Sequence, residues 1–272
     1  MAIVTIFGGT FGDDEELARN VATQLGCQFV SREIFVAASK RCEVPEAKLN
    51  DIVEKEPRWW ERWQENLRPY RIALQAAMTE AALGGDMVYH GHVGHGLLPG
   101  IRHVLRILLT APMEYRIKQV RERQGMEAKA RRYIEQVEKA RTRRLMALVG
   151  ADWRDPERYA LILNMAQMSS IAAQNMIVAA AKLIDYQPTE ASRQALADLA
   201  LSARIQAHFL TYQRLRDLNI QVVAKQGEVS LFGILPSSVS ESEIRRAVET
   251  LPEVKKVVTD FVNMANTMLR YG

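Results

Sequence analysis

The spacing of apolar and polar residues differs between two parts of the chain. In the first part, short apolar runs alternate with segments in which apolar residues recur every three or four positions. This order is typical of buried parallel strands joined by amphipathic helices. The predicted strands are residues 2–6, 28–30, 87–90, 104–110 and 160–163. The pattern therefore predicts an α/β fold, a parallel sheet with helices on both faces.

The helices predicted between these strands carry start and stop signals. The first has Leu17, Val21 and Leu25 on one face, which is the spacing of a helix that packs on a sheet. A helix at residues 70–83 ends at a Gly-Gly pair, which is a common C-terminal stop. Further helices are predicted from near Ile34, along the basic segment after residue 112, and over residues 169–183.

The second part of the chain predicts a small α+β unit with the order αββαβ. Its predicted elements are a helix at 190–218, strands at 220–224 and 229–234, a helix at 241–251 and a strand at 254–262. Gly227 supplies the positive φ of a tight hairpin between the first two strands. A chain of 272 residues exceeds the usual size of one domain. We therefore predict two domains, residues 1–185 and 194–272, joined by a linker at 186–193.

Composition favours a cytoplasmic protein. The longest apolar runs contain polar residues and fall short of the roughly 20 apolar residues needed to cross a bilayer. No basic segment precedes an apolar stretch at the N-terminus, so we expect no signal peptide. Cys27 and Cys42 lack CxxC spacing and histidine neighbours, which indicates reduced, partly buried thiols.

Positive charge is concentrated in one segment. Residues 116–144 contain eleven Lys or Arg and four Glu, a local excess of +7 in a chain whose net charge is +4. A run of charges is usually a solvated helix face. Arginines at helical spacing on both sides of Gly125 also suit a lid, because such a helix pair can close over a phosphate and exclude water. Only Tyr133 lies among these basic residues, so nucleic-acid binding by base stacking is not expected.

A cluster of tryptophans lies in the polar segment at residues 43–70. Trp59, Trp60 and Trp63 stand at helical spacing. We expect them to pack their helix onto the body of its own domain or onto a second subunit, which leaves a homo-oligomer open. Base stacking is the alternative.

A glycine-rich turn follows the first strand, where nucleotide-binding folds place a phosphate loop. Gly8, Gly9, Thr10 and Gly12 provide the flexible backbone that a phosphate-binding turn needs. The helix behind the turn opens with four carboxylates, residues 13–16, and the turn has no lysine. Acidic residues in a first helical turn also complement the helix dipole, so simple capping is an alternative explanation.

The histidines after the third predicted strand are His90, His92 and His95. No carboxylate or cysteine lies near them in the sequence at ligand spacing, so we predict no metal site. A turn interleaved with glycines wraps an anion or a small ligand more naturally.

Several motifs resemble the cytidylate kinase-like family, in order and over about residues 2–183. They are Val4-Thr5-Ile6, the loop at Phe11-Gly12, Ser31-Arg32-Glu33-Ile34, Tyr89-His90-Gly91 with Gly94, residues 97–101, Ala111-Pro112 with Tyr115-Arg116-Ile117, Asp152-Trp153 with Asp155-Pro156, and residues 159–164. The resemblance implies a P-loop nucleoside monophosphate kinase fold, ATP as donor, CMP or a related nucleotide as acceptor, Mg²⁺, and an arginine-rich lid.

Site residues follow from this resemblance. The nucleotide-binding candidates are Gly8, Gly9, Thr10, Gly12, Arg32, Gly91 and His92. The catalytic candidates are Arg116, Arg141 and Arg144, and the further lid arginines are Arg123, Arg131 and Arg132.

Three departures from the family pattern leave two functions open. The family's Phe-Gly-Ser-Gly-Gly loop is replaced by Phe11-Gly12-Asp13-Asp14-Glu15, its Asp-Arg-Glu by Ser31-Arg32-Glu33, and its Gly-Arg by Gly91-His92. One carboxylate close to the donor phosphates could weaken triphosphate binding about tenfold or more, unless Mg²⁺ bridges the two. The chain is then either a phosphotransferase acting on ATP and CMP, or an inactive nucleotide-binding regulator.

The C-terminal unit resembles a BON domain over about residues 194–266. The matching segments are the hairpin at residues 226–233 and the helix-to-strand turn at residues 251–257. The resemblance implies binding to a phospholipid surface or to another ligand. In the regulatory hypothesis, the nucleotide site signals its occupancy to this unit.

Overall fold

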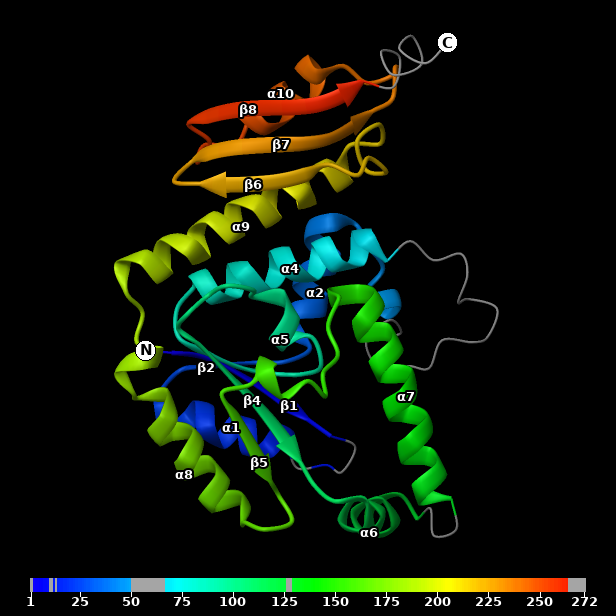
Figure 1. Cartoon of the computed structure of the whole chain (residues 1–272), viewed down its shortest axis with the longest axis vertical. Coiled ribbons are helices and arrows are strands. Elements are labelled where there is room, and N and C mark those ends of the chain that lie inside the picture. Colours follow the sequence, from blue (N-terminus) through cyan, green and yellow to red (C-terminus); the bar gives the residue numbers. More distant parts are fainter. Residues whose placement is uncertain (1, 10–11, 13, 50–66, 126–128, 264–272) are drawn as a thin grey trace.

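The computed structural model describes residues 2–9, 12, 14–49, 67–125 and 129–263. Within these residues, five parallel strands form one sheet in the order β2-β3-β1-β4-β5 (Figure 1). The strands are β1 (Ile3–Gly8), β2 (Gln28–Val30), β3 (Met87–His90), β4 (Val104–Thr110) and β5 (Leu161–Asn164). The predicted tryptophan helix, with Trp59, Trp60 and Trp63, lies outside the described residues.

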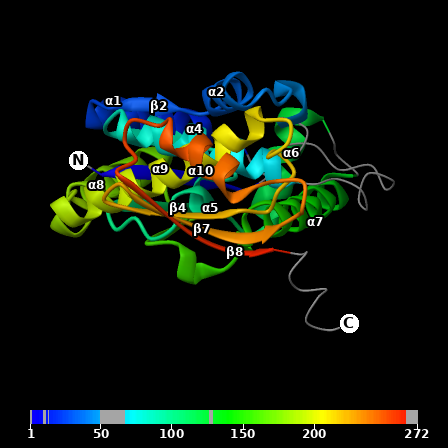
Figure 2. The same cartoon turned by 90° about the horizontal axis from the view of Figure 1, so that it is seen from above.

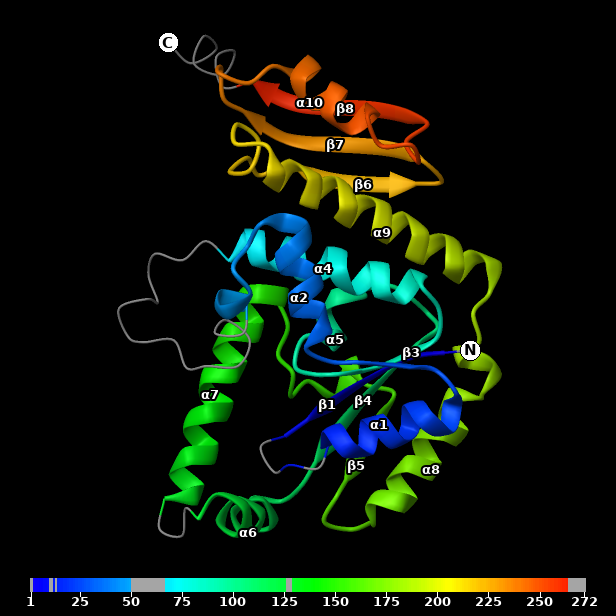
Figure 3. The ribbon, with the colours of Figure 1, turned by 180° about the vertical axis from the view of Figure 1, so that it is seen from behind.

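Helices cover both faces of this sheet, which confirms the predicted fold class. Alternate residues of β1 serve the two faces: Val4 and Ile6 pack in one apolar core, and Ile3 and Phe7 in the other. The first core is completed by α1 (Asp14–Leu25) and α8 (Ser170–Ala181), and the second by α2 (Glu33–Cys42), α4 (Arg68–Leu83) and α5 (Gly94–Leu97). Figures 1 and 3 show these two layers on opposite sides of the sheet.

The first helix matches its predicted inner face, because Leu17, Val21 and Leu25 are all buried. The first strand differs from its prediction: β1 continues two residues beyond Ile6 and includes Gly8. Register with β4 explains the extension, because Gly8 pairs with Leu109 and continues the parallel ladder. Gly8 is thus a sheet residue from which the loop departs.

The basic segment forms a helical hairpin beside the sheet. It consists of α6 (Met113–Gln124) and α7 (Ala130–Val149), and Gly125 ends α6 in the left-handed conformation, as the predicted glycine break requires. A small apolar cluster between the helices, which includes Ile117 and Ile134, is separate from the two cores of the sheet. The hairpin therefore has packing of its own.

The C-terminal unit has the predicted αββαβ order. Its sheet contains β6 (Gln221–Lys225), β7 (Glu228–Leu235) and β8 (Lys256–Asn263), with β6 antiparallel and β8 parallel to β7. Seen from above, α9 (Glu190–Thr211) and α10 (Glu241–Glu249) lie on the same side of β7 and β8 (Figure 2). Among the described residues, no helix combines the length and apolarity needed to cross a bilayer.

The predicted helix at 190–218 is too long. Tyr212 has extended backbone angles and ends α9, and the next residues form turns. The turn carries Leu215 into the C-terminal core, where only 1% of it is exposed. Burial of this one leucine gives a physical reason for the early end of the helix.

Helix α9 belongs to two cores at once. One face, with Leu196, Ala203 and Ala207, joins the core under α2 and α4. The other face, with Ile205 and Phe209, joins the core of the C-terminal sheet. The helix therefore begins inside the predicted linker and couples the two units by apolar burial on both sides.

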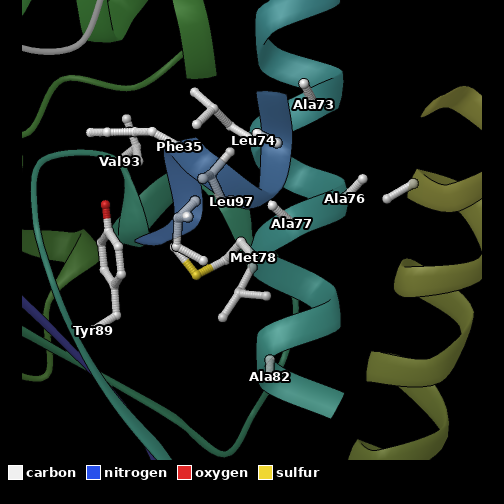
Figure 4. Packing of buried hydrophobic residues seen from close by; sticks show 14 of the residues in the cluster. Phe35, Ala73, Leu74, Ala76, Ala77, Met78, Ala82, Tyr89, Val93 and Leu97 are labelled. Atoms are coloured by element: carbon white, nitrogen blue, oxygen red, sulfur yellow. The ribbon is translucent and has the colours of Figure 1, made fainter. Parts of the chain in front are cut away.

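Small side chains on α4 allow α9 to approach closely. Figure 4 shows Ala76 directed toward α9, while Leu74 and Met78 point to the other side of α4, where Phe35 lies. Larger residues at the positions facing α9 would hold the two helices apart. The alanines of α4 thus set the spacing between this layer and α9.

We predict that cavities on either face of α9 destabilise the whole chain. Leu196→Ala should cost about 2–5 kcal/mol and Phe209→Ala about 3–5 kcal/mol of unfolding free energy. Because the cores share one helix, each variant should shift a single urea transition followed by circular dichroism. The exposed Val223→Ala should have little effect and serves as control. Two separate transitions, only one of them shifted by Phe209→Ala, would contradict this coupling.

We also predict a loss of stability in mild acid. His103 is 3% exposed just before β4, and burial lowers its pKa below the ordinary 6.5, with further lowering by the N-terminus and Arg193. The unfolded chain therefore binds a proton more readily than the folded chain. The contribution of the neutral His103 to the free energy of unfolding should be complete above pH 6.5. It should decrease as the pH drops below that value.

Urea midpoints at pH 7.5 and pH 5 measure this loss, and His103→Asn should reduce it. Burial also lowers the pKa of His208, so the variant should retain part of the decline. An identical decline in the variant would exclude His103 as a contributor.

Candidate nucleotide site

The carboxyl ends of the parallel strands place most of the predicted site residues at one edge of the sheet. Gly8 ends β1, and His90 ends β3 and leads into Gly91 and His92. Arg32 follows β2 and lies exposed where α2 begins. Ligands of open α/β sheets bind at this edge, because the loops there leave the strands together.

The helical hairpin leaves the same edge, because β4 passes directly through Ala111 and Pro112 into α6. An added Cβ on Gly12 would lie 2.5 Å from Nη1 of Arg123, so this guanidinium rests against the glycine loop. The φ of Gly12 is +76°, a conformation that favours glycine. Loop and hairpin are thus in contact through Gly12 and Arg123. Thr10 and Asp13 lie outside the described residues.

Two of the three predicted catalytic arginines are buried in α7. Arg141 is 8% exposed and Arg144 is 7% exposed. Nη1 of Arg141 donates a hydrogen bond to the carbonyl oxygen of Gly8 at 3.5 Å, and its guanidinium lies 5.8 Å from the ring centre of Phe7. Guanidinium groups are costly to bury, and one held against Gly8, as Arg141 is, has the chemistry to bind an anion.

An aromatic stack lies beside Arg141. The ring of Phe7 stacks on Trp153 with centroids 5.0 Å apart and meets His92 edge-on at 5.3 Å. The indole of Trp153 donates a 2.9 Å hydrogen bond to Thr142 in α7. The stack therefore ties the end of β1 to the helix that carries both buried arginines.

The third predicted catalytic residue, Arg116, joins the two helices of the hairpin. Its Nη1 donates to Glu138 of α7, and within the described part of the chain its buried Nε has no hydrogen-bond partner. Arg131 pairs with Glu114, while Arg123, Arg131 and Arg132 are exposed. The basic segment thus divides into buried arginines, of which Arg141 contacts Gly8, and an exposed outer set.

Two predicted glycine donors are engaged within the sheet. The N–H of Gly9 donates to Leu109 at 3.3 Å, and the N–H of Gly91 donates to Ile6 at 3.2 Å. These groups continue the parallel ladder and do not face a ligand. A phosphate at this edge would depend more on side chains than on these two amides.

A carboxylate lies over the position that a phosphate loop leaves open. Oδ2 of Asp14 is 3.2 Å from Nε2 of His90, and a Cβ on Gly8 would lie 1.6 Å from that oxygen. In the P-loop spacing counted from Gly8, Asp14 occupies the lysine position. The sequence has no carboxylate at ligand spacing from these histidines, but the start of α1 lies beside the end of β3 and brings Asp14 to His90.

The resemblance to the cytidylate kinase-like family implies ATP and Mg²⁺, and the described residues around Gly8 do not fit a triphosphate. A triphosphate needs open N–H groups and a lysine, whereas the Asp14 carboxylate rests on Gly8 and the N–H of Gly9 is engaged. Among the described residues, no group of three or more His, Cys, Asp and Glu side chains could hold a metal ion.

The cysteines take no part in this site. Cys27 and Cys42 are free, as expected from their spacing. Burial raises the pKa of the Cys42 thiol to about 11, and burial also raises that of Cys27. Neither thiol is a reactive thiolate at neutral pH.

Comparisons with known proteins identify relatives of both parts of the chain. The sequence model described as the Cytidylate kinase-like family matches residues 3–167, and that of the BON domain matches residues 197–264. The cytidylate kinase of Ignicoccus hospitalis is 28% identical over 184 residues, which cover 65% of this chain and 97% of that protein. The cytidylate kinase of Methanopyrus kandleri is 25% identical over 188 residues, which cover 65% and 92%.

A solved structure shares the fold. An uncharacterised protein from Eubacterium ventriosum superposes with a TM-score of 0.51 at 17% identity, covering 66% of this chain and 98% of that one. At this identity the likeness concerns the fold alone.

Proposed function

We propose that this chain, which belongs to the cytidylate kinase-like family, binds a nucleoside monophosphate at the carboxyl edge of its parallel sheet. The observation that carries the proposal is the burial of Arg141 beside the end of β1, where it is bonded to Gly8, with the buried Arg144 one turn further along α7. Guanidinium groups bind phosphate oxygens bidentately and strongly. Buried ones are screened less by solvent than surface charges are.

The other arginines act around this pair. Arg116 lies at the start of α6 and would add a further donor through Nε, while Arg123 covers the loop at Gly12. Arg131 and Arg132 line the outer part of the lid, and Arg32 lies at the same sheet edge on the far side of β3. The hairpin would close on the bound phosphate as a unit, because it has its own small apolar core.

Phosphoryl transfer is the second candidate function. ATP with Mg²⁺ would supply the phosphoryl group, and the arginines near Gly8 are the groups that stabilise charge during such a transfer. The Asp14 carboxylate over Gly8 argues against efficient use of this donor. We therefore favour a nucleotide-binding regulator of the kinase fold.

Coupling to the C-terminal unit supports a regulatory role. Beyond the shared helix α9, a chain of ion pairs runs from Arg41 of α2 through Glu80 of α4 and Arg204 of α9 to Glu253. The distances are 3.2 Å for Arg41–Glu80 and 3.1 Å for Glu80–Arg204. A shift of α2 on ligand binding would thus change the ion pairs that connect α2 to the C-terminal unit.

The C-terminal unit offers a surface for its own partner. The sheet face turned away from α9 and α10 carries exposed apolar side chains, namely Val223, Phe232, Ile234, Val258 and Val262. We propose that this face contacts the ligand or the phospholipid surface implied by the BON domain match. The nucleotide state would then modulate this contact through α9.

We predict that Arg144→Gln and Arg141→Gln each weaken CMP binding by about 10- to 100-fold, since a hydrogen bond to a charged group contributes about 1.5–3 kcal/mol. Isothermal titration calorimetry of the full chain measures the dissociation constants. Arg143→Gln is the matched control, because it removes the same charge from an exposed position of the same helix. Equal losses in all three variants would indicate a general charge effect and contradict the site.

An assay of ADP release separates the two candidate functions. We predict that the chain binds at least one nucleoside monophosphate and shows no turnover above background with ATP, Mg²⁺ and the four common monophosphates. Steady turnover with any of them would overturn the regulatory proposal and establish the enzyme. Thermal unfolding of each variant identifies losses that arise from misfolding.

A further inference from the structure

We propose that Asp14 is a specificity-determining residue: its carboxylate occupies the donor-phosphate position, so the site discriminates against nucleoside triphosphates and accepts monophosphates. The inference rests on the proposed function, because it concerns the same sheet edge. It adds the residue that excludes a longer phosphate chain from the site.

The first argument is position. Asp14 is the first residue of α1, and the N-terminus of a helix behind a glycine turn is where anions bind in such folds. Its Oδ2 lies so close to Gly8 that even a methyl group on that glycine would collide with it at 1.6 Å. The protein thus supplies its own anion to a site that usually receives one from the ligand.

The second argument is the partner that holds the carboxylate in place. His90 ends β3, and its register with Ile6 of the adjacent β1 brings its ring to the start of the loop. The two side chains are 3.2 Å apart and only 16% and 17% exposed. Because both side chains are largely removed from water, solvent competes little for this contact.

The third argument is charge. A lysine at this point attracts the donor phosphates, whereas an aspartate repels them. One unit charge about 4 Å from a phosphate weakens binding by roughly tenfold or more at the dielectric of a protein surface. A monophosphate held by Arg141 and Arg144 on the α7 side does not have to enter the loop.

The neighbouring acids do not share this role. Glu15 pairs with Arg19 at 2.9 Å, and both side chains are more than half exposed. Glu16 is exposed on the same turn. Glu16→Gln therefore removes an equal charge from the same helix end without changing the loop, and it is the matched control for Asp14→Asn.

The experiment compares CMP with CTP, and AMP with ATP, by calorimetry on the full chain, in EDTA and in Mg²⁺. The wild type should bind each monophosphate at least tenfold more tightly than its triphosphate. Asp14→Asn should strengthen triphosphate binding about tenfold and change monophosphate binding less than about threefold. Glu16→Gln should change neither.

Asp14→Ala provides a second variant, because it removes the carboxylate entirely, and it should give the same gain for triphosphates. Thermal unfolding checks that both variants fold. A ratio of triphosphate to monophosphate affinity that stays at the wild-type value in both folded variants overturns the inference and leaves the proposed function intact.

Two other results would also overturn the inference about Asp14. If Mg²⁺ makes the wild type bind triphosphates tightly, and Asp14→Asn loses that binding, then Asp14 is a metal-bridging residue and the inference is wrong. If neither the wild type nor the Asp14 variants bind any of the four nucleotides, the proposed function fails, and the inference fails with it.

Discussion

Parallel pairing of β1 with both β3 and β4 is the constraint on which the candidate site depends. Strands that run in one direction end at one edge, so Gly8 and His90 meet there although more than eighty positions separate them in the sequence. The same constraint starts the helical hairpin at that edge, because α6 follows β4 directly. Loss of the pairing of β1 with β3 and β4 would separate the glycine loop, the histidine turn and the arginines.

Side chains of opposite charge meet at the carboxyl edge of the parallel sheet. The buried guanidinium of Arg141 lies on one side of Gly8 and would attract an anion, whereas the carboxylate of Asp14 lies against the same glycine. The two requirements are compatible if the ligand's phosphate sits on the arginine side and no further phosphate extends into the loop. This arrangement is the physical basis of the proposal that the scaffold recognises a nucleotide and does not use a triphosphate donor efficiently.

Helix α9 gives the regulatory interpretation its physical basis. A helix buried on one side only could be displaced with its own unit, but α9 places Ala203 in one core and Phe209 in the other. Moving it would disturb packing in both, so a change near α2 or α4 has a mechanical path to the C-terminal sheet. Neither unit of the chain has a complete core without this helix.

The sequence by itself determined most of the elements, the α/β and αββαβ classes and the glycine break in the helical hairpin, because apolar spacing and glycine act locally. It also placed arginines in α7, yet charge counting could not separate buried Arg141 from exposed Arg132. Counting the P-loop spacing would have marked Asp14 as the residue at the lysine position. Its contact with His90, and the early end of α9 that buries Leu215, were decided only by tertiary structure, because each joins residues that the chain brings together by packing.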